Sequence, residues 1–486
     1  MMIKYASVLS LISMFTLFLF SFNNADKNEN PKIVDTLTVA ADFGNAAVNY
    51  QNYCAGCHGE KMGAFVDRKW KHGNDRENLF KAIKLGYQNE GMPSFDSTFT
   101  DKETYQLSDY IISGIKNVER YQGSDKPTSS IFKTEKLTIR LDTVVSGLDV
   151  PWSMAFLPGN EMLVTDRNGK FYYVKKDRSK TLIKGAPEVV AEGQGGLLDV
   201  VLDPNYTKNH MIYLSYSKAG ETENGRILAT TAIMKAKFEK GALTQQKDIF
   251  IAKPYQPTRH HYGSRMQFAK DGTLYFSVGE RGNEKQNPQE LNNNDLGKIH
   301  RINTDGSIPK DNPFVNKGDA EASIYSYGHR NPQGMTIHPE TGKIWTNEHG
   351  PRGGDEINII SPGKNYGWPD ITYGINYNGR PMAPDTKTEK TGMEQPLFQW
   401  TPSIAPSGLA FVTGTKYKGW EGNLMTGSLR FQYLNRSVLK GNKVVNEEIL
   451  FKNIGRVRDV RMAPDGFLYI SVEDPGIIYR LVPVEK

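Results

Sequence analysis

Two cysteines, which are the only ones among 486 residues, lie three positions apart and are followed directly by a histidine. The segment reads Cys54-Ala55-Gly56-Cys57-His58 and has C-x-x-C-H spacing. Thiols one helical turn apart can bond the two vinyl groups of a haem, which places the next residue beneath the iron. A dithiol redox pair or half of a zinc site are the alternatives, but the chain has no second cysteine pair and no βαβ pattern around the motif. The motif therefore predicts a haem c bonded to Cys54 and Cys57 and ligated by His58.

The other axial ligand of the iron is expected from a loop later in the same region. Met92 lies 34 residues after His58 and directly before Pro93, which disfavours a helical conformation for the residue that precedes it. Methionines usually fill gaps in a core. Close to a haem and on a loop, however, a methionine suits the sixth coordination position better. We therefore expect Met92 to be the second iron ligand.

The region around these ligands is expected to be helical. Thr100 and Glu103 have the spacing of a capping box, and the apolar residues that follow share one helical face. This helix is expected to end near Gly114. Residues 44–118 resemble a small class I cytochrome c, which is an all-α domain.

The N-terminal residues indicate export. Lys4 is followed by an apolar run, Tyr5–Phe22, and then by polar residues. This pattern predicts a signal peptide over residues 1–25, with an uncleaved membrane anchor as the alternative, and a linker over residues 26–43. We expect a periplasmic protein that is membrane-anchored only if the segment is uncleaved.

Composition argues against several other classes of protein. The net charge of +6 is small for the length, and Lys and Arg are scattered among acidic residues, so nucleic-acid binding is not expected. No G-x-G-x-x-G motif follows a strand and opens a helix, so a nicotinamide cofactor is not indicated.

Beyond a polar linker at residues 119–136, one short pattern recurs six times. Each copy has a few alternating apolar residues, a turn rich in Pro, Asp, Asn or Gly, and often a β-rich run. The copies begin at Trp152, Leu198, Arg265, Gly334, Gly408 and Arg458. One four-stranded blade per copy predicts an all-β six-bladed propeller over residues 137–486, whereas a β-sandwich would not explain six similar hairpins.

Polar residues occur at or just before the first strand of successive copies. Because equivalent positions of a propeller converge around its axis, these residues are expected to ring one mouth of the channel. They are Gln194, His260, His261, Arg330, Asn331, Ser403, Arg456 and Arg458. Several cations and two adjacent histidines suit an anionic planar ligand, with a neutral histidine left to accept a proton.

Longer motifs in the same copies resemble a known family. They are Tyr327–Gly334, Glu348–Asn358, Asn365–Pro369, Gly193–Leu198 and Asp305–Pro309. These segments are similar to those of the soluble quinoprotein glucose/sorbosone dehydrogenases, and most of all to the aldose sugar dehydrogenase branch. The resemblance covers nearly all of residues 137–484.

The resemblance implies pyrroloquinoline quinone (PQQ) at the propeller mouth, with Ca²⁺ beside its reactive carbonyl. His261 matches the general base that takes the proton of the sugar C1 hydroxyl, and Arg330 matches the residue that polarises the quinone, with Gln194 and Asn331 close by. The backbone carbonyls of Gly350 and Pro351 match the Ca²⁺ ligands; the remaining matches are Ser403, Arg430, Arg456 and Arg458 for the PQQ carboxylates, and Glu356 and Tyr366 for a second Ca²⁺.

Three positions depart from the best-known glucose-oxidising members. His260 stands where they carry Asp, His349 where they carry Gln, and Arg430 where they carry Lys. The change at His260 removes a carboxylate next to the base and so bears on its pKa. The aldose branch tolerates such changes.

Together the two regions predict an enzyme that oxidises an aldose at C1 to the lactone. The reduced quinone would pass electrons singly to the tethered haem, which would pass them to a soluble cytochrome or a respiratory chain. A quinoprotein acting on a non-sugar alcohol or aldehyde is one alternative. A non-catalytic binding propeller with a haem sensor is the other.

Overall fold

The computed structural model describes residues 43–58, 70, 72–377, 381–383 and 385–484. The predicted signal peptide, residues 1–25, and all but the last residue of the first predicted linker lie outside these residues. Within the part of the chain that the structure describes, no helix is long and apolar enough to cross a membrane.

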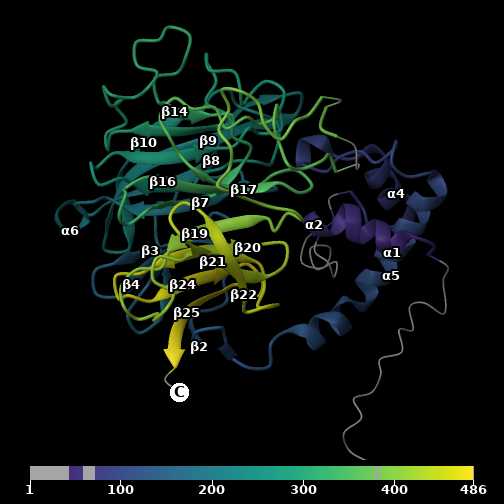
Figure 1. The fold of residues 1–486 in the computed structure, drawn as a ribbon, viewed down its shortest axis with the longest axis horizontal. Helices are drawn as coiled ribbons and strands as arrows, with labels where there is room; N and C mark the ends of the chain where they lie inside the picture. The colour runs from purple at the N-terminus through teal and green to yellow at the C-terminus, as the bar shows by residue number, and fades with distance from the viewer. Residues whose placement is uncertain (1–42, 59–69, 71, 378–380, 384, 485–486) are drawn as a thin grey trace, which may run out of the picture. The chain divides into compact units, whose positions relative to one another are not determined.

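The described part of the chain begins with a helical region (Figure 1). Its elements are α1 (Ala46–Asn49), a π-helical turn (Tyr50–Cys54), α2 (Ala55–His58), α4 (Arg76–Leu85), a 3₁₀ turn (Gln88–Glu90) and α5 (Asp101–Asp125). The Asp75 side chain caps α4 by accepting hydrogen bonds from the backbone N–H groups of Glu77 and Asn78. Buried side chains of these helices, including Tyr50 and Leu107, form one hydrophobic core.

Helix α5 begins as predicted and ends later than predicted. Thr100 and Glu103 form the expected capping box. The helix then continues to Asp125, so the predicted end near Gly114 is wrong. A single glycine costs a helix about 1 kcal/mol and does not have to end it. Pro127 is the stronger stop signal, because proline disfavours the helical conformation for the residue before it.

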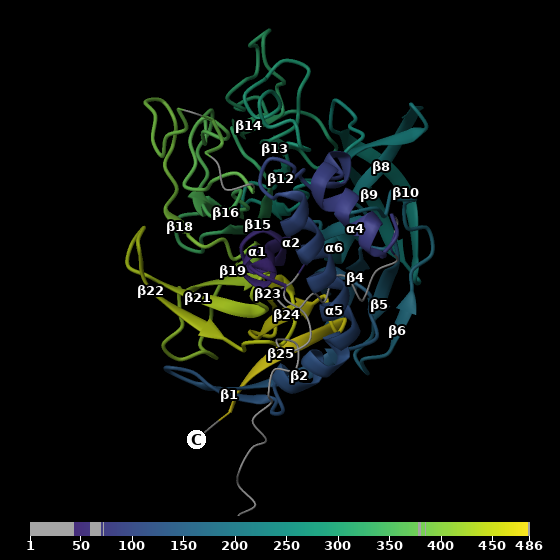
Figure 2. The ribbon, with the colours of Figure 1, turned by 90° about the vertical axis from the view of Figure 1, so that its right-hand side faces the viewer.

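Six sheets follow, each built from strands that are mostly consecutive in sequence (Figure 2). The first strands of neighbouring sheets contact one another in a closed ring. They are β3 (Pro151–Leu157), β7 (Leu197–Leu202), β11 (Met266–Phe268), β15 (Pro332–Ile337), β19 (Pro406–Phe411) and β23 (Val457–Met462). These strands coincide with the six sequence repeats, and the predicted six-bladed propeller is confirmed.

The outer strands complete each blade. The first three blades continue with β4 (Glu161–Asp166), β5 (Phe171–Val174) and β6 (Lys180–Leu182); β8 (Met211–Glu223), β9 (Arg226–Glu239) and β10 (Ala242–Ile251), with the short helix α6 (Tyr206–Asn209) before β8; and β12 (Leu274–Val278), β13 (Lys298–Ile302) and β14 (Ile324–Tyr327). The next two continue with β16 (Ile344–Glu348), β17 (Asp355–Ile359) and β18 (Phe398–Trp400); and β20 (Leu424–Ser428), β21 (Tyr433–Leu439) and β22 (Val444–Leu450).

The sixth blade closes the ring by joining the two ends of the propeller sequence. Its order is β1 (Ile131–Lys133), β2 (Thr138–Val145), β25 (Ile477–Val484), β24 (Leu468–Val472) and β23. Strand β2 is antiparallel to β25, and the two lie side by side in Figures 1 and 2. Because β1 pairs with β2, the propeller sheet begins at Ile131, inside the predicted linker at residues 119–136.

Buried ion pairs link the inner strands. The Arg461 guanidinium donates to the Asp199 carboxylate at 2.6 Å and to the Asp459 carboxylate at 2.9 Å. These carboxylates also accept hydrogen bonds from the backbone N–H groups of Met266 and Met154, which belong to other blades. Breaking one partner of such a network leaves an uncompensated buried charge, so it fixes the relative positions of the blades.

Candidate active site

The loops that lead into the inner strands bring predicted residues together. The Gln194 side-chain carbonyl, before β7, accepts the His261 backbone N–H, before β11, at 2.8 Å. The Asn331 side-chain carbonyl, just before β15, accepts the Gly263 N–H at 3.1 Å. Three successive blades therefore meet here, as the repeat register predicts.

His261 has a buried carboxylate partner that sequence reasoning missed. Its Nδ1 lies within hydrogen-bond distance of the Glu280 carboxylate, which is only 1% exposed. Glu280 also accepts the backbone N–H of Gly282, which fixes the carboxylate. A carboxylate on Nδ1 holds the proton there and leaves Nε2 as the basic nitrogen.

The surroundings of His261 keep its imidazole neutral. Burial lowers the pKa of His261 well below its usual value, and the guanidinium groups of Arg330 and Arg281 lower it further. Burial raises the pKa of Glu280, against the opposing effect of Arg330. A neutral imidazole with a fixed tautomer can act as a general base near neutral pH.

Arg330 lies beside the predicted calcium ligands. It donates to the Gly350 carbonyl at 2.8 Å and to the His349 carbonyl at 3.3 Å. Its guanidinium carbon lies 5.2 Å from the ring centre of Trp368. Glu348 accepts the backbone N–H of Arg330 at 2.8 Å, so the strand that begins after Arg330 is held on its neighbour, β16.

Ser403, on the loop before the fifth blade, contacts the segment of the predicted calcium ligands, and Arg430 contacts Ser403. The Ser403 hydroxyl donates to the Pro351 carbonyl at 3.1 Å, and the Arg430 guanidinium donates to the Ser403 carbonyl at 3.2 Å. The Asp355 carboxylate accepts the Gly350 N–H at 2.8 Å. These bonds hold the carbonyl groups of Gly350 and Pro351 in place, the first on Arg330 and the second on Ser403.

Arg456 and Arg458 share one buried carboxylate, Glu473, which was also missed. The Arg456 Nε donates to it at 2.8 Å and the Arg458 Nε donates to it at 2.7 Å. The two guanidinium groups lower the pKa of Glu473, which burial alone would raise. One carboxylate neutralises one of the two positive charges and leaves an excess charge that suits an anion.

Buried polar atoms without partners indicate that the site fits a polar cofactor. Among the described residues, the Nε atoms of Arg330 and Arg430 and the Nδ2 of Asn331 are buried and lack hydrogen-bond partners. Unpaired buried donors cost about 1–3 kcal/mol each. The quinone oxygens and carboxylates of PQQ would satisfy these donors.

Two of the three positions that depart from the best-known members, His349 and His260, differ in their contacts. Burial lowers the pKa of His349 to about 3, and its Nε2 lies 2.7 Å from the Pro406 carbonyl. The ring of His260 packs edge-on against His261, with ring centres 4.5 Å apart. Its Nδ1 is buried and has no hydrogen-bond partner in the described part of the chain.

Glu356 and Tyr366 lie in a second polar cluster. Asn358 donates to Glu356 at 3.1 Å and to Glu348 at 2.9 Å, while the Tyr366 ring stacks on His329 with centres 4.6 Å apart. Burial and the Glu348 charge raise the pKa of Glu356 to about 8. Two neighbouring carboxylates suit a cation, but no three described His, Cys, Asp or Glu side chains form a metal cluster. The second Ca²⁺ stays a prediction.

The haem-binding residues lie in the helical region. Cys54 ends the π-helical turn and is buried in the hydrophobic core, and His58 ends α2. Cys57 lies within α2, one turn after Cys54. Met92 lies outside the helices, as predicted, and packs against the core that contains Cys54. These positions suit a haem held between His58 and Met92.

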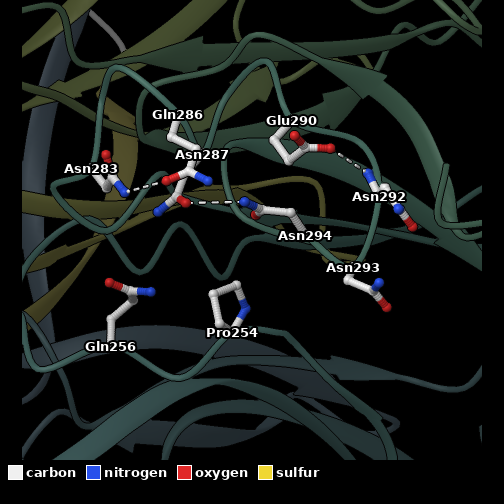
Figure 3. A pocket seen from close by; sticks show the side chains of 9 residues that line it. All are labelled: Pro254, Gln256, Asn283, Gln286, Asn287, Glu290, Asn292, Asn293 and Asn294. Carbon is white, nitrogen blue, oxygen red and sulfur yellow. Dashed lines mark hydrogen bonds between the residues drawn. The ribbon is translucent and has the colours of Figure 1, made fainter. Parts of the chain in front are cut away.

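A polar cavity of about 330 Å³ adjoins the loop that follows Glu280 (Figure 3). Its wall is mainly side-chain amides, contributed by Gln256, Asn283, Gln286, Asn287, Asn292, Asn293 and Asn294, with Pro254 and Glu290. The Asn287 amide donates to the Glu280 carbonyl at 2.8 Å and accepts a hydrogen bond from the Asn294 amide at 3.0 Å. The wall of the cavity therefore helps to hold the backbone of the residue that orients His261.

Comparison with known proteins decides the family. Residues 148–480 match the family described as Glucose / Sorbosone dehydrogenase. The chain belongs to this family. The predicted membership is therefore confirmed, and so is the prediction of an oxidoreductase.

Relatives of this glucose/sorbosone dehydrogenase cover the propeller. Aldose sugar dehydrogenase YliI of Escherichia coli (strain K12) is 39% identical over 360 residues, which are 73% of this chain and 96% of that protein. The crystal structure of the soluble E. coli aldose sugar dehydrogenase in the apo-form has a TM-score of 0.67 at 38% identity, covering 71% of this chain and all of that chain. The PQQ-bound aldose sugar dehydrogenase of Streptomyces coelicolor has a TM-score of 0.59 at 29% identity, over 72% and 99% of the two chains.

The N-terminal region matches a different family. Residues 41–111 match the family described as Cytochrome C oxidase, cbb3-type, subunit III. The predicted cytochrome c domain is thereby confirmed. This glucose/sorbosone dehydrogenase thus carries an added cytochrome domain ahead of its propeller.

Proposed function

We propose that the protein oxidises an aldose at its C1 hydroxyl to the lactone, with PQQ and Ca²⁺ in the propeller and haem c as the electron acceptor. One observation carries the proposal: a buried, neutral His261, oriented by Glu280 and Gln194, close to the Arg330 guanidinium. A base and a fixed cation side by side suit removal of the proton from an alcohol hydroxyl and of a hydride from the carbon that carries it.

Different residues of the chain would have different roles in this reaction. His261 would accept the hydroxyl proton at Nε2, because Glu280 holds Nδ1. Arg330 would place a positive charge where negative charge develops on the quinone oxygen, in a site from which water is largely excluded. When bound, PQQ supplies a carbonyl that accepts the hydride.

The same geometry supports a cofactor cradle. Arg430, Arg456 and Arg458 would bind the PQQ carboxylates together with the Ser403 hydroxyl. The carbonyl groups of Gly350 and Pro351 would contribute oxygen ligands to Ca²⁺, which prefers them. Asp355, whose pKa burial raises to about 7, orients this segment through the Gly350 N–H.

Sugar oxidation releases two electrons, whereas one haem accepts one electron at a time. The electrons would therefore leave singly through the haem held by Cys54, Cys57, His58 and Met92, with reoxidation by an external one-electron acceptor between transfers. We place this reaction in the periplasm, because of the export-like N-terminal residues. Sequencing the N-terminus of the mature protein tests whether residues 1–25 are removed or kept as an anchor.

The test is a visible spectrum of the purified protein reconstituted with PQQ and Ca²⁺. Addition of an aldose is expected to sharpen the haem α-band, as dithionite does. A panel of aldoses, other alcohols and aldehydes identifies the substrate class. Reduction by dithionite with no response to any aldose, in haem or in a soluble dye, would overturn the proposal.

A further inference from the structure

A cation from the propeller lies on an aromatic ring next to the haem attachment site. The Arg352 guanidinium carbon is 4.6 Å from the ring centre of Tyr53. Tyr53 directly precedes Cys54, and Arg352 directly follows Pro351, a predicted Ca²⁺ ligand. The negative face of an aromatic ring attracts a cation at this distance.

A second contact involves the loop of the other iron ligand. Gly91, which directly precedes Met92, lies so close to the propeller that a Cβ there would be 3.2 Å from the Nδ1 of His260. Its φ of +87° also favours glycine. His260 directly precedes the predicted base, so this contact joins the residues next to Met92 and next to His261.

A third contact reaches the site itself. Tyr377 packs against the hydrophobic core that contains Cys54, and its hydroxyl accepts a hydrogen bond from Arg330. Its segment is tied to Arg352, because the backbones of Arg352 and Ile375 exchange two hydrogen bonds of 3.0 Å. One side chain therefore touches both the haem domain and the cation of the catalytic site.

We infer that Arg352 and Tyr377 form a docking surface through which the propeller holds its own cytochrome domain for electron transfer from the quinone site. The inference rests on the proposed function. Arg352 holds the part of the haem domain around Tyr53 and Cys54 against the propeller. Tyr377 is a positioning residue for both Arg330 and the haem domain. Neither contact was expected from the sequence.

The surface must pass two electrons for each aldose that is oxidised. Each aldose loses two electrons and two protons on becoming a lactone. The two electrons cross the surface in separate steps, and each reduces ferric haem to ferrous haem. An external one-electron oxidant returns the haem to the ferric state after each step, and both protons go to solvent.

The first test is Arg352→Gln in the full-length holoprotein, with Arg140→Gln as the matched control. Arg140 is an exposed arginine on β2 and takes no part in the surface. Stopped-flow reduction of the haem by aldose is expected to slow about tenfold or more, because misplaced redox partners react poorly. Reduction of a soluble dye is expected to stay within about twofold, since the propeller site is intact.

A second readout does not need PQQ. Removing the cation beside Tyr53 is expected to lower the haem midpoint potential, because a nearby positive charge disfavours ferric haem. Arg140→Gln is expected to leave the potential unchanged. An Arg352→Gln protein with the wild-type potential and the wild-type rate of haem reduction would overturn the inference.

Tyr377 is tested with two variants and a control from the same segment, Tyr373→Phe, whose hydroxyl bonds only Gln395 in the described structure. Tyr377→Phe keeps the ring and is expected to lower haem and dye reduction by the same factor, through Arg330. Tyr377→Ala also removes the ring, and haem reduction is expected to fall about tenfold further than dye reduction. Equal losses in both assays for Tyr377→Ala would overturn a docking role.

Failure of the proposed function and failure of the docking surface give different results. If wild-type holoprotein reduces neither dye nor haem with any aldose, the proposed function fails, while the potential of the Arg352→Gln protein still reports the contact. If aldose reduces the dye in every variant and the haem at wild-type rates, the function stands and the docking surface fails.

Discussion

The cytochrome region and the propeller build their sites in opposite ways. The predicted haem ligands and attachment residues lie between Cys54 and Met92, within one short stretch of chain. The propeller site takes Gln194, His261, Arg330 and Arg458 from four blades, more than 260 positions apart at the extremes. The first site depends on covalent chemistry and local helices, and the second depends on closure of the ring.

This difference has a consequence for how each site can fail. Removal of both attachment residues is expected to abolish the haem site while the propeller stays folded. Removal of one polar side chain of the propeller site is expected to lower the reaction rate but to leave the cofactor-binding loops in place. Hydrogen bonds from several blades hold each of these loops.

The largest effect is expected from Cys54→Ala combined with Cys57→Ala. Without thiols the haem cannot be attached, so the haem content should fall from one per chain to nearly none. A haem stain of the denatured protein measures this loss. Aldose-driven dye reduction should persist, and its disappearance would show that the propeller needs the haem domain to fold.

His261→Ala is expected to lower kcat for dye reduction by about 10²–10⁴-fold, the usual contribution of a general base. Dithionite-reduced haem spectra should be unchanged. PQQ binding, followed by its absorbance, should also persist. A variant that retains more than half of the wild-type kcat would show that another group takes the proton.

Glu280→Gln is expected to have a smaller effect on the same step. A hydrogen bond to a charged group contributes about 1.5–3 kcal/mol, which corresponds to about 10–100-fold in rate. Glu284→Gln is a control on the same loop, because no hydrogen bond joins Glu284 to His261 in the described structure. Equal effects of the two substitutions on kcat would remove Glu280 from its orienting role.

Thr100→Ala separates the stabilities of the two regions. Loss of the capping box of α5 should lower the free energy of unfolding of the cytochrome region by about 1 kcal/mol. The melting temperature measured at the Soret band should fall. The melting temperature of the propeller, measured by the far-ultraviolet circular dichroism of its β-sheets, should stay the same. A common shift would show that the regions unfold together.

The smallest effect concerns pH. His261 must be neutral to accept a proton, and burial with Arg330 and Arg281 lowers its pKa. The rate is therefore lost only as pH falls through that lowered value, and kcat/KM should stay constant down to about pH 6.5, where an unshifted histidine would be half protonated. An acid limb centred above pH 6.5 would contradict the burial of the base.

Structural features that come from a repeated pattern, or from one continuous stretch of sequence, were predictable from the sequence. Trp152, Leu198 and Arg458 mark inner strands because each copy places alternating residues before a turn. Glu280 was missed because polar residues were sought at the first strand of each copy, whereas Glu280 follows the second strand of its blade, β12. A carboxylate two residues after a buried β-rich run, Leu274–Val278, was the signal that could have found it.

Other features depend on contacts between distant segments. Glu473 is recognisable as an anion partner only once Arg456 and Arg458 converge on it. The end of α5 was misplaced because Gly114 was given more weight than Pro127. Tyr377 lies in an irregular segment between β17 and β18, where neither helical nor strand periodicity fixes the direction of a side chain.

The late end of α5 also sets the length of the tether. Only residues 126–130 separate the helix from β1, instead of the eighteen positions of the predicted linker. A fully extended connector of this length spans about 17 Å. A connector this short gives the cytochrome region an effective concentration in about the millimolar range at the propeller. At that concentration a contact as weak as one cation–π pair is populated. A haem bound as predicted would therefore stay within reach of the propeller at any concentration of the protein.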